Sequence, residues 1–248
     1  MMLLWLAKHE SIFSMQLFYN PDINTDLKEF SFDKEESKHI IRVLRKLEGD
    51  VLFVTNGLGE LFTTEIILAS EKKCTVKIVT TKTSKPSDFY IHLAVAPTKM
   101  NDRFEWFLEK ATEMGIHEIT PIICDRSERK IIKTERFDKI ILSAMKQSLQ
   151  YYLPKLNEPI SFKDFINQKH DGNLCIAHCV ETDKKLLKNY IKPKEKYTIL
   201  IGPEGDFSEK EIQLALTNNY IPVSLGNTRL RTETAAVVAC HSVVFVNE

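Results

Sequence analysis

The stretch "YTILIGPEGDFSEKEI", residues 197–212, joins an apolar run to a glycine-containing loop and then to a helix start signal. Residues 197–201 are short, rich in β-formers and nearly all apolar, which is typical of a strand buried on both faces of a parallel sheet. Ser208 and Glu211 have the spacing of a capping box and predict a helix from Glu209. Strand, tight loop and helix form the α/β unit, in which ligands bind at the carboxyl ends of strands.

The glycines of this loop leave two interpretations open. Gly202 and Gly205 carry no Cβ, so the backbone there can adopt φ > 0 or approach a ligand closely. The loop lacks both the Walker A and the G-x-G-x-x-G pattern, which disfavours a phosphate cradle. A plain βα turn, in which the glycines serve geometry alone, is the alternative.

A second glycine loop lies in "IPVSLGNTRLRTETAAVVACHSVV", residues 221–244. Leu225 and Gly226 close a strand, and Thr232 predicts the cap of a long apolar helix that runs to about residue 246. Two such loops at neighbouring strand ends would together wall one pocket. Arg231, Glu233 and Thr234 would bring polar groups to its mouth, although ordinary solvated charges at a helix start are the alternative.

The two halves of the chain differ in their pattern of predicted strands and helices. Residues 89–248 alternate strand and helix patterns, which predicts a parallel sheet covered on both faces. The expected strands lie in 90–97, 118–124, 173–180, 197–203 and 220–226, and the expected helices in 102–115, 134–152, 182–191, 208–219 and from 232. Residues 15–86 are mostly strands with a hairpin at Asn56-Gly57, and residues 81–88 are expected to be a linker.

One helix is expected within the first half, over residues 32–50. Asp33 and Glu36 form its predicted cap pair and Gly49 its stop signal. Short strands around one helix suggest a small barrel. Residues 1–14 have no basic n-region and no small-residue cleavage site, so we interpret them as an N-terminal extension rather than a targeting signal.

The overall composition excludes few classes of protein, so only local clusters of charge can indicate a nucleic-acid partner. Lys+Arg and Asp+Glu each number 34 in 248 residues, so the formal net charge is +0 and argues neither for nor against nucleic acid. The five cysteines are scattered and include no C-x-x-C pair, and Cys175, His178 and Cys179 would lie on both faces of one strand. We therefore expect no metal site, reduced thiols, a cytoplasmic location and no membrane association.

Several segments in the same order closely resemble the RsmE family. They are "HIIRVLRKLEGD" (39–50), "KMNDRFEWFLEKATEMGIHEITPIICDRSERK" (99–130), "IGPEGDFSEKEI" (201–212) and "LGNTRLRTETA" (225–235). These are bacterial methyltransferases that methylate a uridine of 16S ribosomal RNA at N3. The resemblance extends from about Met15 to the C-terminus.

The resemblance implies a SPOUT-type α/β methyltransferase domain over residues 87–248, with a C-terminal trefoil knot and a PUA-like β-barrel RNA-binding domain before it over residues 15–86. It implies S-adenosylmethionine as cofactor, a homodimer, and 16S ribosomal RNA within the small subunit or its precursor as partner. The implied cofactor residues are Ile201, Gly202, Glu204, Gly205, Leu225, Gly226, Leu230 and Thr232. The candidate catalytic residues are Arg126, Arg231 and Glu233, which could steady a uridine anion or accept its proton.

Two basic segments are candidates for RNA contact. Residues 34–46 and 126–136 each hold five basic and two acidic side chains, a net charge of +3. The candidate contacts are His39, Arg42, Arg45, Lys46, Arg129 and Lys130. Such a run is most often a solvated face, but two of them inside family motifs favour phosphate contacts.

The chain departs from the family pattern at three places. Asp206 stands where the family usually has the last glycine of G-P-E-G-G, and aspartate is among the better substitutes if φ is positive there. Thr228 takes the place of an arginine, which here comes one residue later as Arg229. The family's Glu-Gln-Ser-x-Arg is Lys-Gln-Ser-Leu-Gln over residues 146–150.

Two alternative functions stay open. One is a methyltransferase of this fold that acts on another RNA, and the other is an RNA-binding module without chemistry.

Overall fold

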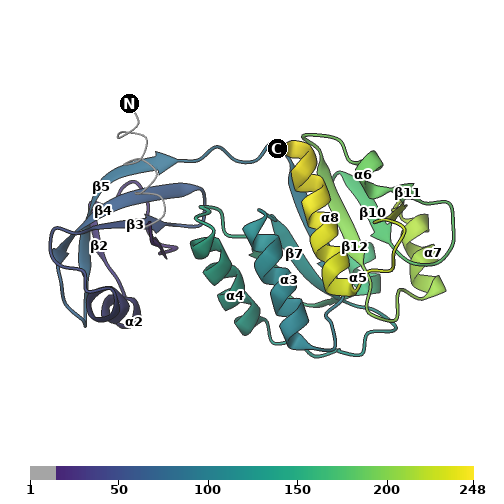
Figure 1. The fold of residues 1–248 in the computed structure, drawn as a ribbon, viewed down its shortest axis with the longest axis horizontal. Helices are drawn as coiled ribbons and strands as arrows, with labels where there is room; N and C mark the ends of the chain where they lie inside the picture. The colour runs from purple at the N-terminus through teal and green to yellow at the C-terminus, as the bar shows by residue number, and fades with distance from the viewer. Residues whose placement is uncertain (1–14) are drawn as a thin grey trace. The chain divides into compact units, whose positions relative to one another are not determined.

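The computed structural model describes residues 15–248, so the predicted extension over residues 1–14 lies outside the described part (Figure 1). The chain forms two compact units. One comprises the chain up to Pro86 together with Met145–Leu153, and the other comprises Ser87–Ala144 and Pro154–Glu248. Each unit has its own sheet.

The first unit is a curled five-stranded sheet with the order β1-β3-β4-β5-β2. Its strands are β1 (Leu17–Tyr19), β2 (Glu29–Ser31), β3 (Val51–Thr55), β4 (Glu60–Leu68) and β5 (Thr75–Thr83). All pairs are antiparallel except β1 with β3. Alternate residues of these strands fill a core that includes Phe18, Leu52, Val54 and Phe62. The hairpin predicted at Asn56-Gly57 joins β3 to β4, as expected.

The helix of this unit is shorter than the sequence predicts. Asp33 caps α2 (Lys34–Lys38), where its side chain accepts a hydrogen bond from the Glu36 N–H at 2.7 Å. The chain continues as a π-helical turn, η1 (His39–Val43), and then leaves helical geometry, with Arg45 at φ 55°. The predicted extension of the helix to Gly49 is therefore wrong, because the backbone reverses at Arg45 instead.

A segment from much later in the chain completes the first unit. The Gly59 N–H donates to the Tyr151 carbonyl at 2.8 Å, and the Leu153 N–H donates to the Gly57 carbonyl at 2.9 Å. Gly59 lies at φ +94°, and a Cβ there would overlap the Tyr152 ring. The hairpin turn thus packs against residues that lie more than ninety positions later in the chain, so the sequence around the turn does not predict this contact.

The second unit is an α/β sandwich. Its sheet has the order β11-β13-β10-β12-β6-β7-β8, with β9 beside β7, and every pair is parallel. The strands are β6 (Tyr90–Val95), β7 (Glu118–Ile123), β8 (Lys155–Leu156), β9 (Ile160–Ser161), β10 (Asn173–Ala177), β11 (Lys185–Leu186), β12 (Lys196–Ile201) and β13 (Ile221–Ser224). Leu93, Ile176 and residues 199–200 are fully buried, as expected for strands covered on both faces.

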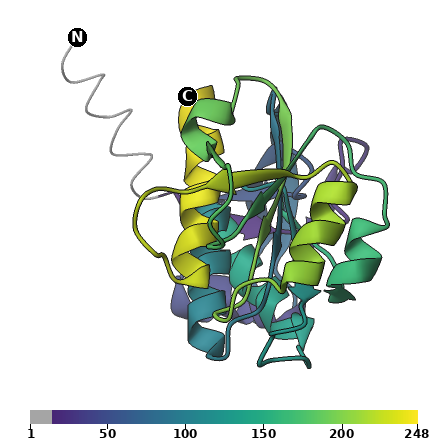
Figure 2. The same cartoon turned by 90° about the vertical axis from the view of Figure 1, so that its right-hand side faces the viewer.

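Helices cover both faces of this sheet, as Figure 2 shows. Helices α3 (Asn101–Glu113) and α8 (Thr232–Asn247) pack on one face, and α5 (Phe162–Ile166) and α7 (Glu209–Thr217) on the other. Helix α4 (Thr134–Gln147) contacts α3 through Phe137 and Phe104, whose ring centroids are 5.1 Å apart. No helix within residues 15–248 combines the length and apolarity needed to span a membrane.

Two predicted helices of the second half are too long. Helix α4 ends at Gln147 rather than near residue 152, and Leu149 at φ 55° turns the chain away. Only Leu187–Tyr190 is helical (α6) in the segment expected to be helical over 182–191, because residues 185–186 pair with β13 instead. Strand pairing across the sheet thus overrides the local helical pattern.

A buried polar network lies at the amino ends of β6 and β7. The His92 Nε2 is 2.7 Å from the Thr120 hydroxyl, and Asn157 donates to both Thr120 and Glu118 at 2.7 Å. Tyr90 also donates to Glu118, at 2.8 Å. His92 is only 6% exposed, and this burial lowers its pKa to about 4. His92 is therefore neutral at pH 7.

Candidate functional site

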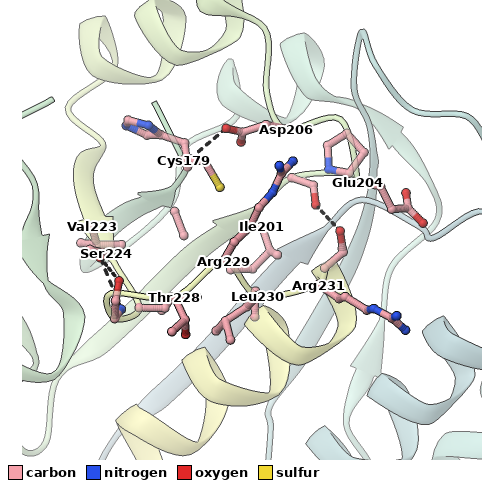
Figure 3. Close-up of a pocket in the computed structure, with 18 of the residues that line it drawn as sticks. Cys179, Ile201, Glu204, Asp206, Val223, Ser224, Thr228, Arg229, Leu230 and Arg231 are labelled. Carbon is pink, nitrogen blue, oxygen red and sulfur yellow. Dashed lines mark hydrogen bonds between the residues drawn. The ribbon is translucent and has the colours of Figure 1, made fainter. Parts of the chain in front are cut away.

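The two glycine loops lie at the carboxyl ends of β12 and β13, on either side of β10 in the sheet. They wall a cavity of about 690 Å³ (Figure 3). All eight residues predicted for the cofactor lie on its wall: Ile201, Gly202, Glu204, Gly205, Leu225, Gly226, Leu230 and Thr232. The fold brings together residues that are separate in sequence, while their binding role stays a prediction.

The first loop is shaped by close packing under its glycines. A Cβ on Gly202 would lie 3.1 Å from the ring of Phe207, which is fully buried, so only glycine fits there without displacing the ring. The Asp206 N–H donates to the Pro203 carbonyl at 2.9 Å, and Asp206 has φ 62°. Asp206 thus has the positive φ under which aspartate is among the better substitutes for glycine, and Gly202 allows close packing against Phe207.

Helix α7 anchors this loop to the end of β7. The predicted capping box is present, because Ser208 N–H donates to Glu211 Oε2 at 2.8 Å and Glu211 N–H donates to the Ser208 hydroxyl at 3.3 Å. The other oxygen of Glu211 accepts the Asp125 N–H at 2.8 Å. One buried carboxylate therefore starts the helix and fixes a neighbouring loop.

The structure assigns a specific contact to Arg126, one of the three candidate catalytic residues. Its guanidinium donates to the carbonyls of Gly205 at 3.0 Å and Phe207 at 3.3 Å. Arg126 thus supports the outer side of the first loop. The Glu204 side chain is also engaged, since its Oε1 accepts the Lys99 N–H at 3.0 Å.

The second loop is held by Ser224 and by the start of α8. The Ser224 hydroxyl donates to the Gly226 carbonyl at 2.9 Å, and Gly226 has φ +142°, a conformation that disfavours any side chain. Thr232 does not cap α8 as predicted, because Arg231 is the N-cap and Thr232 the first helical residue. The buried Thr232 hydroxyl instead donates to the Gly202 carbonyl at 3.0 Å and joins the two glycine loops.

Sequence reasoning missed a third wall of the cavity, formed by Ala177 at the end of β10, by His178 and Cys179 after it, and by Lys184. Lys184 Nζ donates to the His178 carbonyl at 3.0 Å and the Val180 carbonyl at 2.9 Å. The strand that precedes this wall was predicted. The position of β10 between β12 and β13 depends on the order of strands in the sheet, which the local sequence pattern does not predict.

A second cavity of about 670 Å³ adjoins the first and shares Arg229, Leu230 and Arg231 with it. The side chains of Arg229 and Arg231 leave the loop in different directions (Figure 3). Glu233 lines the second cavity and is only 7% exposed. Its Oε1 is 3.9 Å from Arg103 Nε, and its Oε2 has no hydrogen-bond partner among the described residues.

The predicted RNA contacts lie in two places. His39, Arg42, Arg45 and Lys46 belong to the first unit, where His39 Nδ1 is 3.3 Å from Glu36 Oε1. The other two, Arg129 and Lys130, follow β7 in the second unit, where Arg129 donates to the Ile131 carbonyl at 3.2 Å. Arg42 and Arg45 are exposed, and neither forms an ion pair within residues 15–248.

Within residues 15–248, no group of three or more His, Cys, Asp or Glu side chains could hold a metal ion. Cys175 is buried within β10, and Cys179 is exposed in the loop that follows this strand.

Comparison with known proteins decides the family. Residues 83–244 match the family described as RNA methyltransferase domain, and residues 32–79 match the RNA methyltransferase PUA domain. Ribosomal RNA small subunit methyltransferase E of Buchnera aphidicola is 32% identical over 225 residues, which is 86% of this chain and 87% of that protein. The chain belongs to the RsmE family. The sequence resemblance is thereby confirmed.

Solved structures give the same answer for the fold. A probable rRNA methyltransferase from Porphyromonas gingivalis has 39% identity and a TM-score of 0.87, covering 94% of this chain and 98% of that one. A putative methyltransferase from Legionella pneumophila, solved in complex with its bound cofactor SAM, has 30% identity and a TM-score of 0.84 with the same coverage. The predicted fold class, a SPOUT-type α/β domain after a PUA-like domain, is confirmed.

Proposed function

We propose that this RsmE-family protein transfers a methyl group from S-adenosylmethionine to N3 of a specific uridine in 16S ribosomal RNA. The names of its relatives support a small-subunit rRNA substrate, and the SAM-bound neighbour supports the cofactor. The choice of uridine N3 follows the resemblance to the RsmE family, and Glu233 is the residue we assign to the N3 proton. We further propose a cytoplasmic homodimer that acts on the small subunit or its precursor.

The first cavity fits this cofactor. Its volume of about 690 Å³ lies within the range of about 300–1,000 Å³ usual for small-molecule pockets. The backbone of Gly226 is open, since a Cβ there would meet nothing within 4 Å, and Ile201, Val223 and Leu230 add apolar surface. Such a wall suits an uncharged adenine, and a cofactor without phosphate needs no P-loop lysine.

Glu233 is the observation that carries the proposed chemistry. S-adenosylmethionine supplies a methyl group already activated by its sulfonium. Uridine N3 carries a proton and is a poor nucleophile until that proton leaves. A buried carboxylate oxygen without a donor is costly, and an N3–H group would satisfy it. Glu233 therefore accepts the proton as N3 takes the methyl group.

Arg231 would act beside Glu233. It lines both cavities at the N-cap of α8, so a guanidinium is available where negative charge develops on the uracil oxygens. Since N3 lies on the pairing edge, the uridine must be unpaired when it reacts. The two basic segments would hold the surrounding phosphates.

The test uses small subunits from cells that lack the modification. Glu233→Gln should lower methyl transfer at saturating cofactor by about 10²–10⁴-fold, the usual size of general-base assistance. The affinity for S-adenosylmethionine, measured by calorimetry, should stay within about twofold because Glu233 lies in the neighbouring cavity. The exposed Glu209→Gln is the matched control and should transfer normally.

The product must also identify the atom. A methyl group on N3 blocks pairing, so reverse transcription should stop at the modified uridine, and nucleoside mass spectrometry should identify 3-methyluridine. Normal transfer by Glu233→Gln would refute the base assignment. Methylation of a different RNA, or cofactor binding without transfer to any RNA, would favour one of the two alternative functions.

A further inference from the structure

Asp206 lies on the cavity wall with a backbone conformation that favours glycine. It adopts φ 62°, in the left-handed region. For a residue other than glycine this conformation is uncommon, although aspartate tolerates it better than most. Glycine would satisfy the backbone alone, so the carboxylate must be explained by its contacts.

Those contacts reach a different loop. Asp206 Oδ2 accepts the Cys179 N–H at 2.8 Å, and Oδ1 accepts its neighbour Phe207 N–H at 2.9 Å. Figure 3 shows the first of these bonds running from the glycine loop to the loop that follows β10. A glycine at this position could take the same φ but could not form either bond.

The loop after β10 has few other ties to this wall. Regular pairing between β10 and β12 ends at Ala177 and Ile201. Lys184 closes the loop on itself through the carbonyls of His178 and Val180. Within residues 15–248 we find no second hydrogen bond between residues 178–180 and 202–207, so Asp206 fixes the third wall to the first.

We propose that Asp206 is a positioning residue that holds the Cys179 loop against the cavity so that the cofactor meets a preformed third wall. This rests on the proposed function for the identity of the ligand. A preformed wall improves affinity because binding need not order it. Both oxygens of Asp206 accept backbone N–H groups, so we expect the effect to fall on cofactor affinity and KM, with kcat at saturation retained.

Asp206→Gly, which removes the carboxylate and tolerates the positive φ, is the decisive variant. The Kd for S-adenosylmethionine should rise about tenfold, corresponding to about 1.4 kcal/mol. Its Tm should not fall, because glycine relieves the left-handed backbone. Asp206→Asn retains an acceptor oxygen and should keep the Kd within about threefold. Asn219→Gly, at an exposed residue with φ 66° outside the cavity, is the control and should bind normally.

A second measurement, made without cofactor, reports whether the Cys179 loop is held in place. Cys179 is exposed whereas the other four cysteines are buried, so iodoacetamide labelling of the native protein reports on this loop. The labelling rate should rise several-fold in Asp206→Gly and stay unchanged in Asn219→Gly. Wild-type Kd and wild-type labelling in Asp206→Gly would overturn the proposal. Failure of the wild-type protein to bind S-adenosylmethionine would instead refute the proposed function, while the labelling rates would still test the contact.

Discussion

Thr232→Val should separate the two glycine loops with almost no change in side-chain volume. The Thr232 hydroxyl donates to the Gly202 carbonyl at 3.0 Å, and Thr232 is only 5% exposed. Valine replaces that hydroxyl with a methyl group of similar size. The carbonyl of Gly202, itself buried, is then left without this donor.

The magnitude follows from burial. Leaving a buried acceptor unsatisfied costs about 1–3 kcal/mol. For a chain of this length a loss of about 2 kcal/mol lowers the Tm by roughly 4–8 °C. The affinity for S-adenosylmethionine should fall several-fold as well, because Gly202 and Thr232 both line the cavity.

Urea unfolding followed by circular dichroism measures the first effect and calorimetry the second. Thr217→Val is a close control, because the Thr217 hydroxyl also donates to a backbone carbonyl, that of Gln213, at 2.9 Å. Thr217 is exposed, so water replaces the missing donor and the cost should stay below about 0.5 kcal/mol. Equal destabilisation by the two variants would refute the view that this hydroxyl joins the loops.

Two further predictions concern pH and RNA. Because the pKa of His92 falls from 6.5 to about 4 on folding, the unfolded chain binds the extra proton between these values, and stability declines as pH falls. Between pH 7.5 and 5.0, protonation of His92 should lower the free energy of unfolding by about 2 kcal/mol. His92→Gln should abolish this contribution to the pH dependence. An unchanged pH dependence in the variant would contradict the lowered pKa of His92. Replacing Arg42, Arg45 and Lys46 by alanine should flatten the slope of log K for RNA against log salt, with cofactor binding intact. The expected change is about 0.7–0.9 for each lysine or arginine that no longer neutralises a phosphate. An unaltered slope would make this segment a solvated face.

Features set by neighbouring residues could be predicted from the sequence. The capping box of Ser208 and Glu211 formed because its partners are three residues apart. The hairpin at Asn56-Gly57 and the strands of the parallel sheet followed from local pattern in the same way. The family motifs then located the eight wall residues, which no periodicity would have grouped.

Features that depend on contacts between residues distant in the chain could not be predicted from the sequence. Arg126 was a candidate catalytic residue in the sequence, and its guanidinium donates to carbonyls some eighty positions away, which no local pattern indicates. Thr232 had the residue type of an N-cap, but the nearby Gly202 carbonyl offered its hydroxyl a buried partner. Such contacts depend on strand order, which short-range pattern does not encode.

The segment Met145–Leu153 has a consequence for how the protein is made. During synthesis the amino-terminal strands leave the ribosome first, but the carbonyl of Tyr151 and the ring of Tyr152, which pack on the Gly57–Gly59 turn, follow only after α3, β7 and α4. The first unit therefore reaches its final form late, after much of the second has been translated. No single cut in the chain yields both units whole, so recombination could not exchange the PUA-like part as a simple N-terminal cassette.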